Sequence, residues 1–203
     1  MTCGGSTIGL AEAVAIPGAS MELAEGLARG DRGAFERLVT QHHDQVAGLA
    51  YRLLGWSDEV HDVVQDVFLS ALANARHFRG QSEVGTWLTT ITLNTCRKRW
   101  RRALIRRKLL PGLRLLRASG TAHRSDRKAM STEVDGTVQD AVRALPMGLR
   151  EVIVLHYLEQ KPVEQVATLL GIKRNAVEVR LVRARDRLRN LLMGVAEGCF
   201  DAR

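Results

Sequence analysis

Positively charged side chains are concentrated between positions 97 and 108 of this chain. The segment holds no acidic residue, and its basic members are Arg97, Lys98, Arg99, Arg101, Arg102, Arg106, Arg107 and Lys108. Such side chains bind phosphate groups, and the release of condensed counterions drives that association. The formal net charge of +8 extends the preference for polyanions to the whole chain. Charge alone does not decide between DNA, RNA and an anionic membrane.

Residues that could perform catalysis or bind a metal do not form a recognisable group. Cys3, Cys96 and Cys199 are an odd number, lie far apart and lack the spacing of a zinc site or a disulfide framework. His42 and His43 are adjacent and cannot share one helix face. No carboxylate cluster and no nucleophile with a partner base is visible. The sequence therefore predicts a protein that is not an enzyme and uses no metal and no cofactor.

The amino-terminal segment carries no targeting signal that we recognise. Residues 1–19 are rich in Gly and Ala and lack the basic and long apolar regions of a signal peptide. No stretch of the sequence reaches the roughly 20 apolar residues of a membrane-spanning helix. Together with the unpaired cysteines, this predicts a cytoplasmic protein with no membrane partner. We expect residues 1–20 to be a disordered, dispensable extension, and Met21 to serve as the working start.

Apolar residues recur at spacings of three and four along most of the chain, which is the pattern of amphipathic helices. Aromatic residues make up only 4% of the sequence, fewer than a β-rich core normally uses. The expected fold is all-α, with two small helical domains joined by a basic linker. The expected boundaries are residues 21–110 for the first domain, 111–132 for the linker, 133–194 for the second domain and 195–203 for a tail.

Capping residues predict where the helices of the first domain begin and end. Asp31 is the expected N-cap of one helix and Gly55 its end, the next helix starts at Ser57, and Ser82 caps a third. The three- and four-residue spacing of the apolar residues also predicts which side of each helix is buried. The residues expected inside include Val60, Val63, Val64, Val67, Phe68, Ala71 and Leu72 of the second helix, and Val138 and Leu158 of the second domain.

The segment VEQVATLLGIKRNAVEVRLVRAR predicts a helix-turn-helix, with small Ala167 at the helix crossing and Gly171 in the turn. If Val177 and Leu181 are buried, a basic face of the second helix is exposed. We expect this face to bind DNA, its residues being Lys173, Arg174, Asn175, Glu178, Arg180, Arg183 and Arg185. Arg174 and Asn175 would meet base edges, and the later arginines would meet phosphates.

Glu178 has two possible roles on that helix. Its carboxylate could accept a hydrogen bond from a cytosine amino group in the major groove and so select a base. It could instead pair with Arg174 or Arg185 along the helix and carry no specificity. The sequence leaves both roles open.

Three stretches together resemble one family. DVVQDVFLSAL, HFRGQSEVGTWLTTITLNTCRKRWRR and the helix-turn-helix segment from Ala144 to Arg189 are similar to regions two and four of extracytoplasmic-function sigma factors. The resemblance covers most of residues 30–192. It implies a promoter-recognition subunit whose partners are RNA polymerase core and promoter DNA, and it raises the expectation of an anti-sigma factor.

The resemblance assigns roles to residues of the first domain. Its second helix would dock on the largest subunits of core polymerase through Asp62, Gln65, Asp66 and Leu69, whereas Phe68 is more consistent with the core. The following loop and helix would open and hold the minus-ten element, through Phe78, Arg79, Gly80, Gln81, Ser82, Asn94, Arg97, Lys98 and Arg101. Trp87 lies on an apolar stripe, which favours packing over base stacking. The second domain would bind the minus-thirty-five element.

The recognition helix departs from the family pattern, since Ala176 and Glu178 replace a hydroxyl and a basic side chain. The promoter sequence therefore cannot be carried over from the family. The runner-up function is a helix-turn-helix transcription regulator that is not a polymerase subunit. Co-purification with core polymerase would separate the two.

Overall fold

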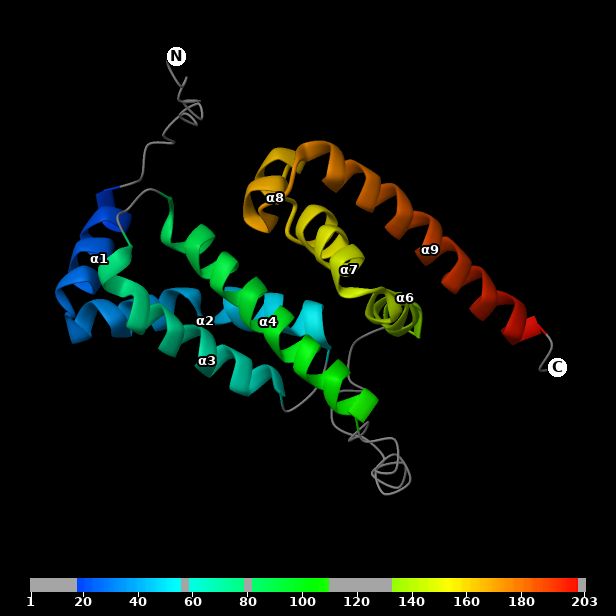
Figure 1. The fold of residues 1–203 in the computed structure, drawn as a ribbon, viewed down its shortest axis with the longest axis horizontal. Helices are drawn as coiled ribbons and strands as arrows, with labels where there is room; N and C mark the ends of the chain where they lie inside the picture. The colour runs from blue at the N-terminus through cyan, green and yellow to red at the C-terminus, as the bar shows by residue number, and fades with distance from the viewer. Residues whose placement is uncertain (1–17, 56–58, 79–81, 110–132, 201–203) are drawn as a thin grey trace, which may run out of the picture.

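The computed structural model describes residues 18–55, 59–78, 82–109 and 133–200. These residues form only helices and their connections, without a strand (Figure 1). The first domain contains α1 (Gly18–Arg29), α2 (Arg32–Leu54), α3 (Glu59–Asn74), a 3-10 turn η1 (Ala75–His77) and α4 (Val84–Leu109). The second contains α6 (Glu133–Ala144), α7 (Met147–Ile153), a π-helical turn η3 (Val154–Leu158), α8 (Val163–Leu170) and α9 (Arg174–Phe200).

The expected all-α fold with two helical domains is confirmed. Helix α1 begins at Gly18, within the stretch expected to be an extension, and α9 continues to Phe200, into the expected tail. Residues 1–17 and the linker residues 110–132 lie outside the described residues, as does the expected start at Ser57. No helix of the described part is long and apolar enough to cross a membrane.

Local chemistry explains where α2 begins and ends. The Asp31 carboxylate accepts a hydrogen bond from the Gly33 N–H at 2.9 Å and so satisfies a free donor of the first turn. At the other end, Gly55 has φ +81° and its N–H donates to the Tyr51 carbonyl at 2.7 Å. Only glycine adopts this backbone conformation without strain. Both predicted boundaries of this helix are confirmed.

The start of α4 differs from the prediction. Its first backbone hydrogen bonds go from Thr86 and Trp87 to the carbonyl of Glu83, at 3.0 and 3.1 Å. Glu83 therefore precedes the first helical residue, Val84, and the expected cap Ser82 was wrong by one position. Capping signals place a helix end only to within a residue or two, because neighbouring polar residues compete for the same role.

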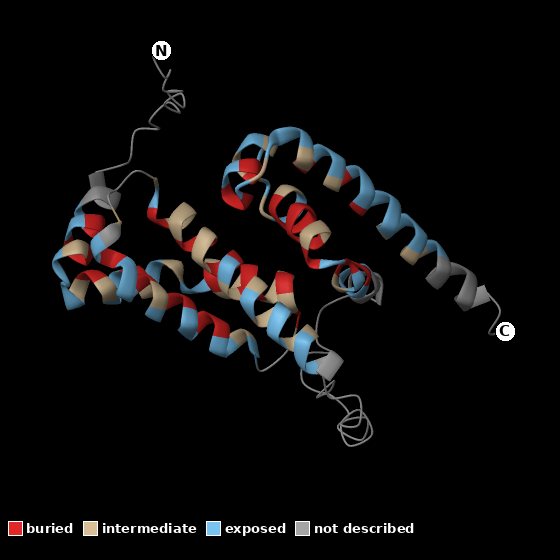
Figure 2. Cartoon of the chain, in the orientation of Figure 1, coloured by how far each residue is buried: buried red, intermediate tan, exposed pale blue. Residues whose placement is uncertain are grey.

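The core of the first domain lies where α2, α3 and α4 pack against one another (Figure 2). Leucines and valines of all three helices are fully buried there, among them Leu38, Leu49, Leu53, Val63, Val67 and Leu88. Phe68 is 6% exposed and belongs to this core, as predicted. Three residues expected inside are exposed: Leu72 is 45% exposed, Val138 44% and Leu158 51%. Each lies at the edge of its apolar stripe, where spacing alone does not separate core from surface.

The two domains are in contact. Helix α4 packs on α7 and α8, and α2 packs on α6, α7 and η3, so the second domain lies along the first (Figure 1). Within the second domain, α7 and α8 both pack on α9. Gly171, at φ +66°, forms the turn between α8 and α9, and the Ile172 N–H closes it on the Ala167 carbonyl at 3.0 Å. The predicted helix-turn-helix is therefore formed.

Candidate polymerase and nucleic-acid interfaces

The outer face of α3 carries the four residues predicted to bind core polymerase. Asp62, Gln65, Asp66 and Leu69 are all exposed, while the valines between them point into the core. Arg99 of α4 donates to Asp62 at 3.3 Å and to Asp66 at 3.0 Å, both bonds ending on Oδ2. The hydrogen bond to Asp66, followed by the one to Asp62, raises the pKa of the Arg99 guanidinium above its ordinary value. The two carboxylates are thus held in place by a neighbouring helix.

An apolar pair accompanies these polar groups. Leu69 is 55% exposed, and Leu72, three residues later on the same helix, is 45% exposed. Large apolar side chains that gather on a surface often mark a binding site. The exposure of Leu72 was not predicted from the sequence, because the spacing of Leu72 also fits the buried stripe. Its position three residues after Leu69 was the signal that could have placed it on the exposed face.

Phe78 and Trp87 stack at the start of the predicted minus-ten site. Their ring centroids are 4.6 Å apart with an interplanar angle of 26°, and both rings pack against the domain core. Trp87 is therefore a packing residue, in keeping with its place on the apolar stripe. Arg79, Gly80 and Gln81 lie outside the described residues, and Ser82 is half-buried.

The polar residues further along α4 point in different directions. Asn94, Lys98 and Arg101 are exposed and line a shallow surface depression together with Arg102 and Ile105. Among the described residues, the basic side chains of Lys98, Arg101 and Arg102 form no ion pair. Arg97 instead turns toward the second domain, where its Nε and Nη2 donate to the Glu151 carboxylate at 2.6 and 3.0 Å. The third nitrogen of the guanidinium, Nη1, donates to Asn94 at 3.4 Å, so Arg97 lies between the second domain and the exposed basic face.

The recognition helix α9 presents the polar face expected of it. Lys173, Arg174, Asn175 and Glu178 are exposed at its start, and Arg183 and Arg185 are exposed further along. Val177, Leu181 and Ala184 of the same helix are buried instead. Arg180 differs, because it is half-buried and its guanidinium lies against Gly148 of α7.

Arg174 lies between two carboxylates. Its Nε donates to Glu178 of the same helix at 2.9 Å, and its Nη1 lies 2.9 Å from a carboxylate oxygen of Glu164 on α8. The hydrogen bond to Glu178 and then the charge of Glu164 raise the pKa of the Arg174 guanidinium. Of the two roles open to Glu178, pairing with Arg174 is the one present in this structure.

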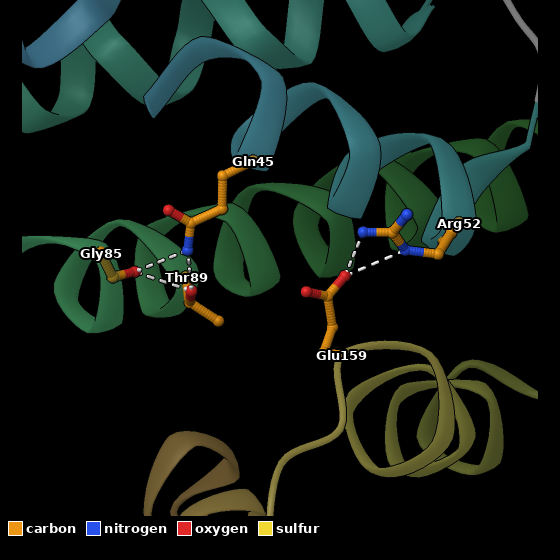
Figure 3. Close-up of polar contacts among 5 residues, drawn as sticks. All are labelled: Gln45, Arg52, Gly85, Thr89 and Glu159. Carbon is orange, nitrogen blue, oxygen red and sulfur yellow. Dashed lines mark hydrogen bonds and ion pairs between the residues drawn. The ribbon is translucent and has the colours of Figure 1, made fainter. Parts of the chain in front are cut away.

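Inter-domain contacts were absent from the sequence prediction. Arg52 of α2 pairs with Glu159, which directly follows η3 (Figure 3). Figure 3 also shows Gln45, whose side-chain amide donates to the Gly85 carbonyl and the Thr89 hydroxyl and so ties α2 to the start of α4. No short sequence pattern signals a pair such as Arg52–Glu159, because the partners are 107 positions apart.

Comparison with known protein families agrees with this division into domains. The Sigma-70 region 2 family matches residues 38–104, and the Sigma-70 region 4 family matches residues 136–188. The first match covers α3 and most of α4, and the second covers the helix-turn-helix. Two domains of this kind in this order define a sigma factor and do not fit an ordinary helix-turn-helix regulator.

Individual relatives define the group within that family. The ECF RNA polymerase sigma factor SigM of Mycobacterium tuberculosis is 34% identical over 171 residues, which cover 84% of this chain and 83% of SigM. The ECF RNA polymerase sigma-E factor of Haemophilus influenzae is 33% identical over 178 residues, covering 83% of this chain and 92% of that protein. Among solved structures, CnrH in complex with the cytosolic domain of CnrY matches with a TM-score of 0.61 at 31% identity, covering 87% of this chain and 98% of CnrH. The chain belongs to the extracytoplasmic-function sigma factors of the sigma-70 family, which direct RNA polymerase core to promoters.

Proposed function

We propose that the outer face of α3 is the docking site for RNA polymerase core. The observation that carries this proposal is the combination on one face of exposed Gln65, exposed Leu69 and two carboxylates held by Arg99. Apolar side chains surrounded by oriented polar groups are the usual composition of a protein–protein interface. Leu72 extends the same face and is included in the proposed site.

The basic surfaces of α4 and α9 then hold the two promoter elements. Lys98 and Arg101 present unpaired charge to the minus-ten DNA, with Asn94 beside them, and Arg97 joins them once it is released from Glu151. The start of α9 reads the minus-thirty-five element through Arg174 and Asn175, while Arg183 and Arg185 contact phosphates. CnrH, the relative bound by the cytosolic domain of CnrY, supports the expectation of an anti-sigma partner here as well.

Reconstitution with core polymerase tests the docking site. The double variant Gln65→Ala/Leu69→Ala is compared with Thr40→Ala/Gln41→Ala, which also truncates two exposed side chains but lies on α2. We expect the α3 variant to bind core polymerase about tenfold or more weakly, since truncating central interface residues costs about 1 to 2 kcal/mol or more. Both variants should melt like the native chain. Equal affinity of the two variants for core polymerase would contradict the assignment, and run-off transcription from a genomic promoter pool gives the functional readout.

A further inference from the structure

Two exposed valines lie on the outer side of the recognition helix α9. Val179 and Val182 are each 48% exposed. An α-helix turns about 100° per residue, so Val179, two positions after the buried Val177, points to nearly the opposite side of the helix. Val182 lies two positions before the buried Ala184 and points outward for the same reason. The two valines are three positions apart, which makes them neighbours on one face.

Basic side chains surround this pair of valines. The exposed basic residues of this part of α9 are Lys173, Arg174, Arg183 and Arg185. The acidic side chains Glu178 and Asp186 are each paired with an arginine of the same helix, at 2.9 and 3.3 Å. A positive rim attracts a polyanion, and a helix-turn-helix places the first half of its second helix in the major groove. Charge and position therefore favour DNA over a protein partner as the occupant of this face.

A valine side chain recognises only one base in the major groove. It has no hydrogen-bond donor or acceptor, so its favourable contacts are apolar, and thymine alone presents a methyl group in that groove. Against the polar edge of another base, a valine displaces water and leaves donors and acceptors unpaired, which costs free energy. Two valines at the base-reading end of α9 are therefore suited to thymine and poorly suited to the other bases.

The spacing of the two valines sets how many base pairs they cover. Side chains three positions apart on a helix have Cβ atoms about 5 to 6 Å apart, and successive base pairs are about 3.4 Å apart along the DNA axis. The pair therefore spans one to two base-pair steps. Val179 and Val182 follow the first helical residue, Arg174, by about 8 and 12 Å along the helix axis, a length that the major groove, about 12 Å wide, accommodates.

We propose that Val179 and Val182 contact the 5-methyl groups of two thymines, one or two base-pair steps apart, in the minus-thirty-five element of this sigma factor. The inference rests on the proposed function, because it takes the start of α9 as the reader of that element. Asn175, one turn before Val179, is exposed on the same face and supplies hydrogen bonds, while the valines supply apolar contacts. Burying one thymine methyl group against a valine raises the affinity for DNA about fourfold.

Exchange of thymine for uracil isolates this contact, because the two bases pair identically and differ only in the 5-methyl group. Holoenzyme containing the native chain first enriches a minus-thirty-five element from a randomised DNA pool, and each thymine of that element is then changed to uracil in turn. We expect the affinity to fall about fourfold at each of two neighbouring thymines. In holoenzyme containing Val179→Ala/Val182→Ala, the same two changes should have no effect. Met193→Ala truncates another exposed apolar side chain of α9 and should keep the native response.

Several results would overturn the proposal. If the double variant responds to uracil as the native chain does, another residue or the shape of the DNA explains the preference for thymine. If that unchanged response is accompanied by weaker binding to core polymerase, the valines contact a protein. Enrichment of an element whose thymines tolerate uracil refutes the thymine contacts alone, whereas no enrichment at all refutes base reading by α9 as well.

The single variants Val179→Ala and Val182→Ala assign the two contacts. Each should abolish the response to uracil at one of the two thymines and leave the other response intact. They also serve in place of the double variant if circular dichroism shows that the double variant melts early.

Discussion

Arg150 provides a test of how the two domains are held together. It is 6% exposed, and its guanidinium donates to the carbonyls of Leu53, Arg143 and Leu145, the last at 3.0 Å. These carbonyls lie at the C-terminal ends of α2 and α6. The last carbonyls of a helix lack partners within the helix, and the helix dipole favours positive charge there. Burial, followed by the nearby charge of Arg143, lowers the pKa of the Arg150 guanidinium, while Glu151 raises it. We expect the Arg150→Met variant to lose stability because it leaves these carbonyls without a donor.

The magnitude follows from the three hydrogen bonds. At roughly 1 to 1.5 kcal/mol for each lost bond, less about 1 kcal/mol regained by burying methionine, the net loss is about 3 kcal/mol. For a chain of this size, that loss corresponds to a fall in Tm of about 6 to 12 °C. Thermal unfolding followed by far-UV circular dichroism measures it.

Two further variants make the Arg150 test specific. Arg150→Lys keeps the charge but cannot reach all three carbonyls, so its Tm should lie between those of the native chain and Arg150→Met. Arg29→Met changes an exposed arginine on α1 and should shift Tm by about 1 to 2 °C at most. If Arg150→Met melts within that same range, the three carbonyls do not depend on Arg150 and the reasoning fails.

Two other residues yield predictions of different kinds. Burial, and secondly the charge of Glu151, raises the pKa of the Cys96 thiol from 9.0 to about 12, so Cys96 should resist alkylation at pH 8 until the chain is unfolded. A variant with Cys3 and Cys199 changed to Ser isolates this thiol, and rapid labelling under native conditions would refute its burial. Between pH 9 and 12 the thiol ionises in the unfolded chain but not in the folded chain. The free energy of unfolding should therefore fall as the pH rises through that window, and ionisation of Cys96 should not affect it at lower pH. The Cys96→Ala variant should show a shallower fall. Glu178→Ala should leave base preference in the upstream element unchanged, because Arg174 already engages the carboxylate; relaxed preference at one position of a randomised library would show instead that Glu178 reads a base.

The local pattern of the sequence was enough to determine the helices and their inward faces. Asp31 and Gly55 mark the two ends of α2, and Gly171 marks the turn before the recognition helix, because each acts through backbone groups within a few residues. The assignment to the sigma factors also followed from short motifs in their order along the chain. Edge positions such as Leu72 were misjudged, since spacing defines the centre of an apolar stripe better than its border.

Only the tertiary structure decided which charged side chains remain available for binding. Within the basic run, Arg97 pairs with Glu151 and Arg99 with Asp66, whereas Lys98 is exposed. In the sequence these three neighbours are equivalent, because net charge and spacing do not say which helix each side of α4 will meet. Arg97 and Glu151 are 54 positions apart, and what joins them is the packing of two domains, a contact that local periodicity does not encode.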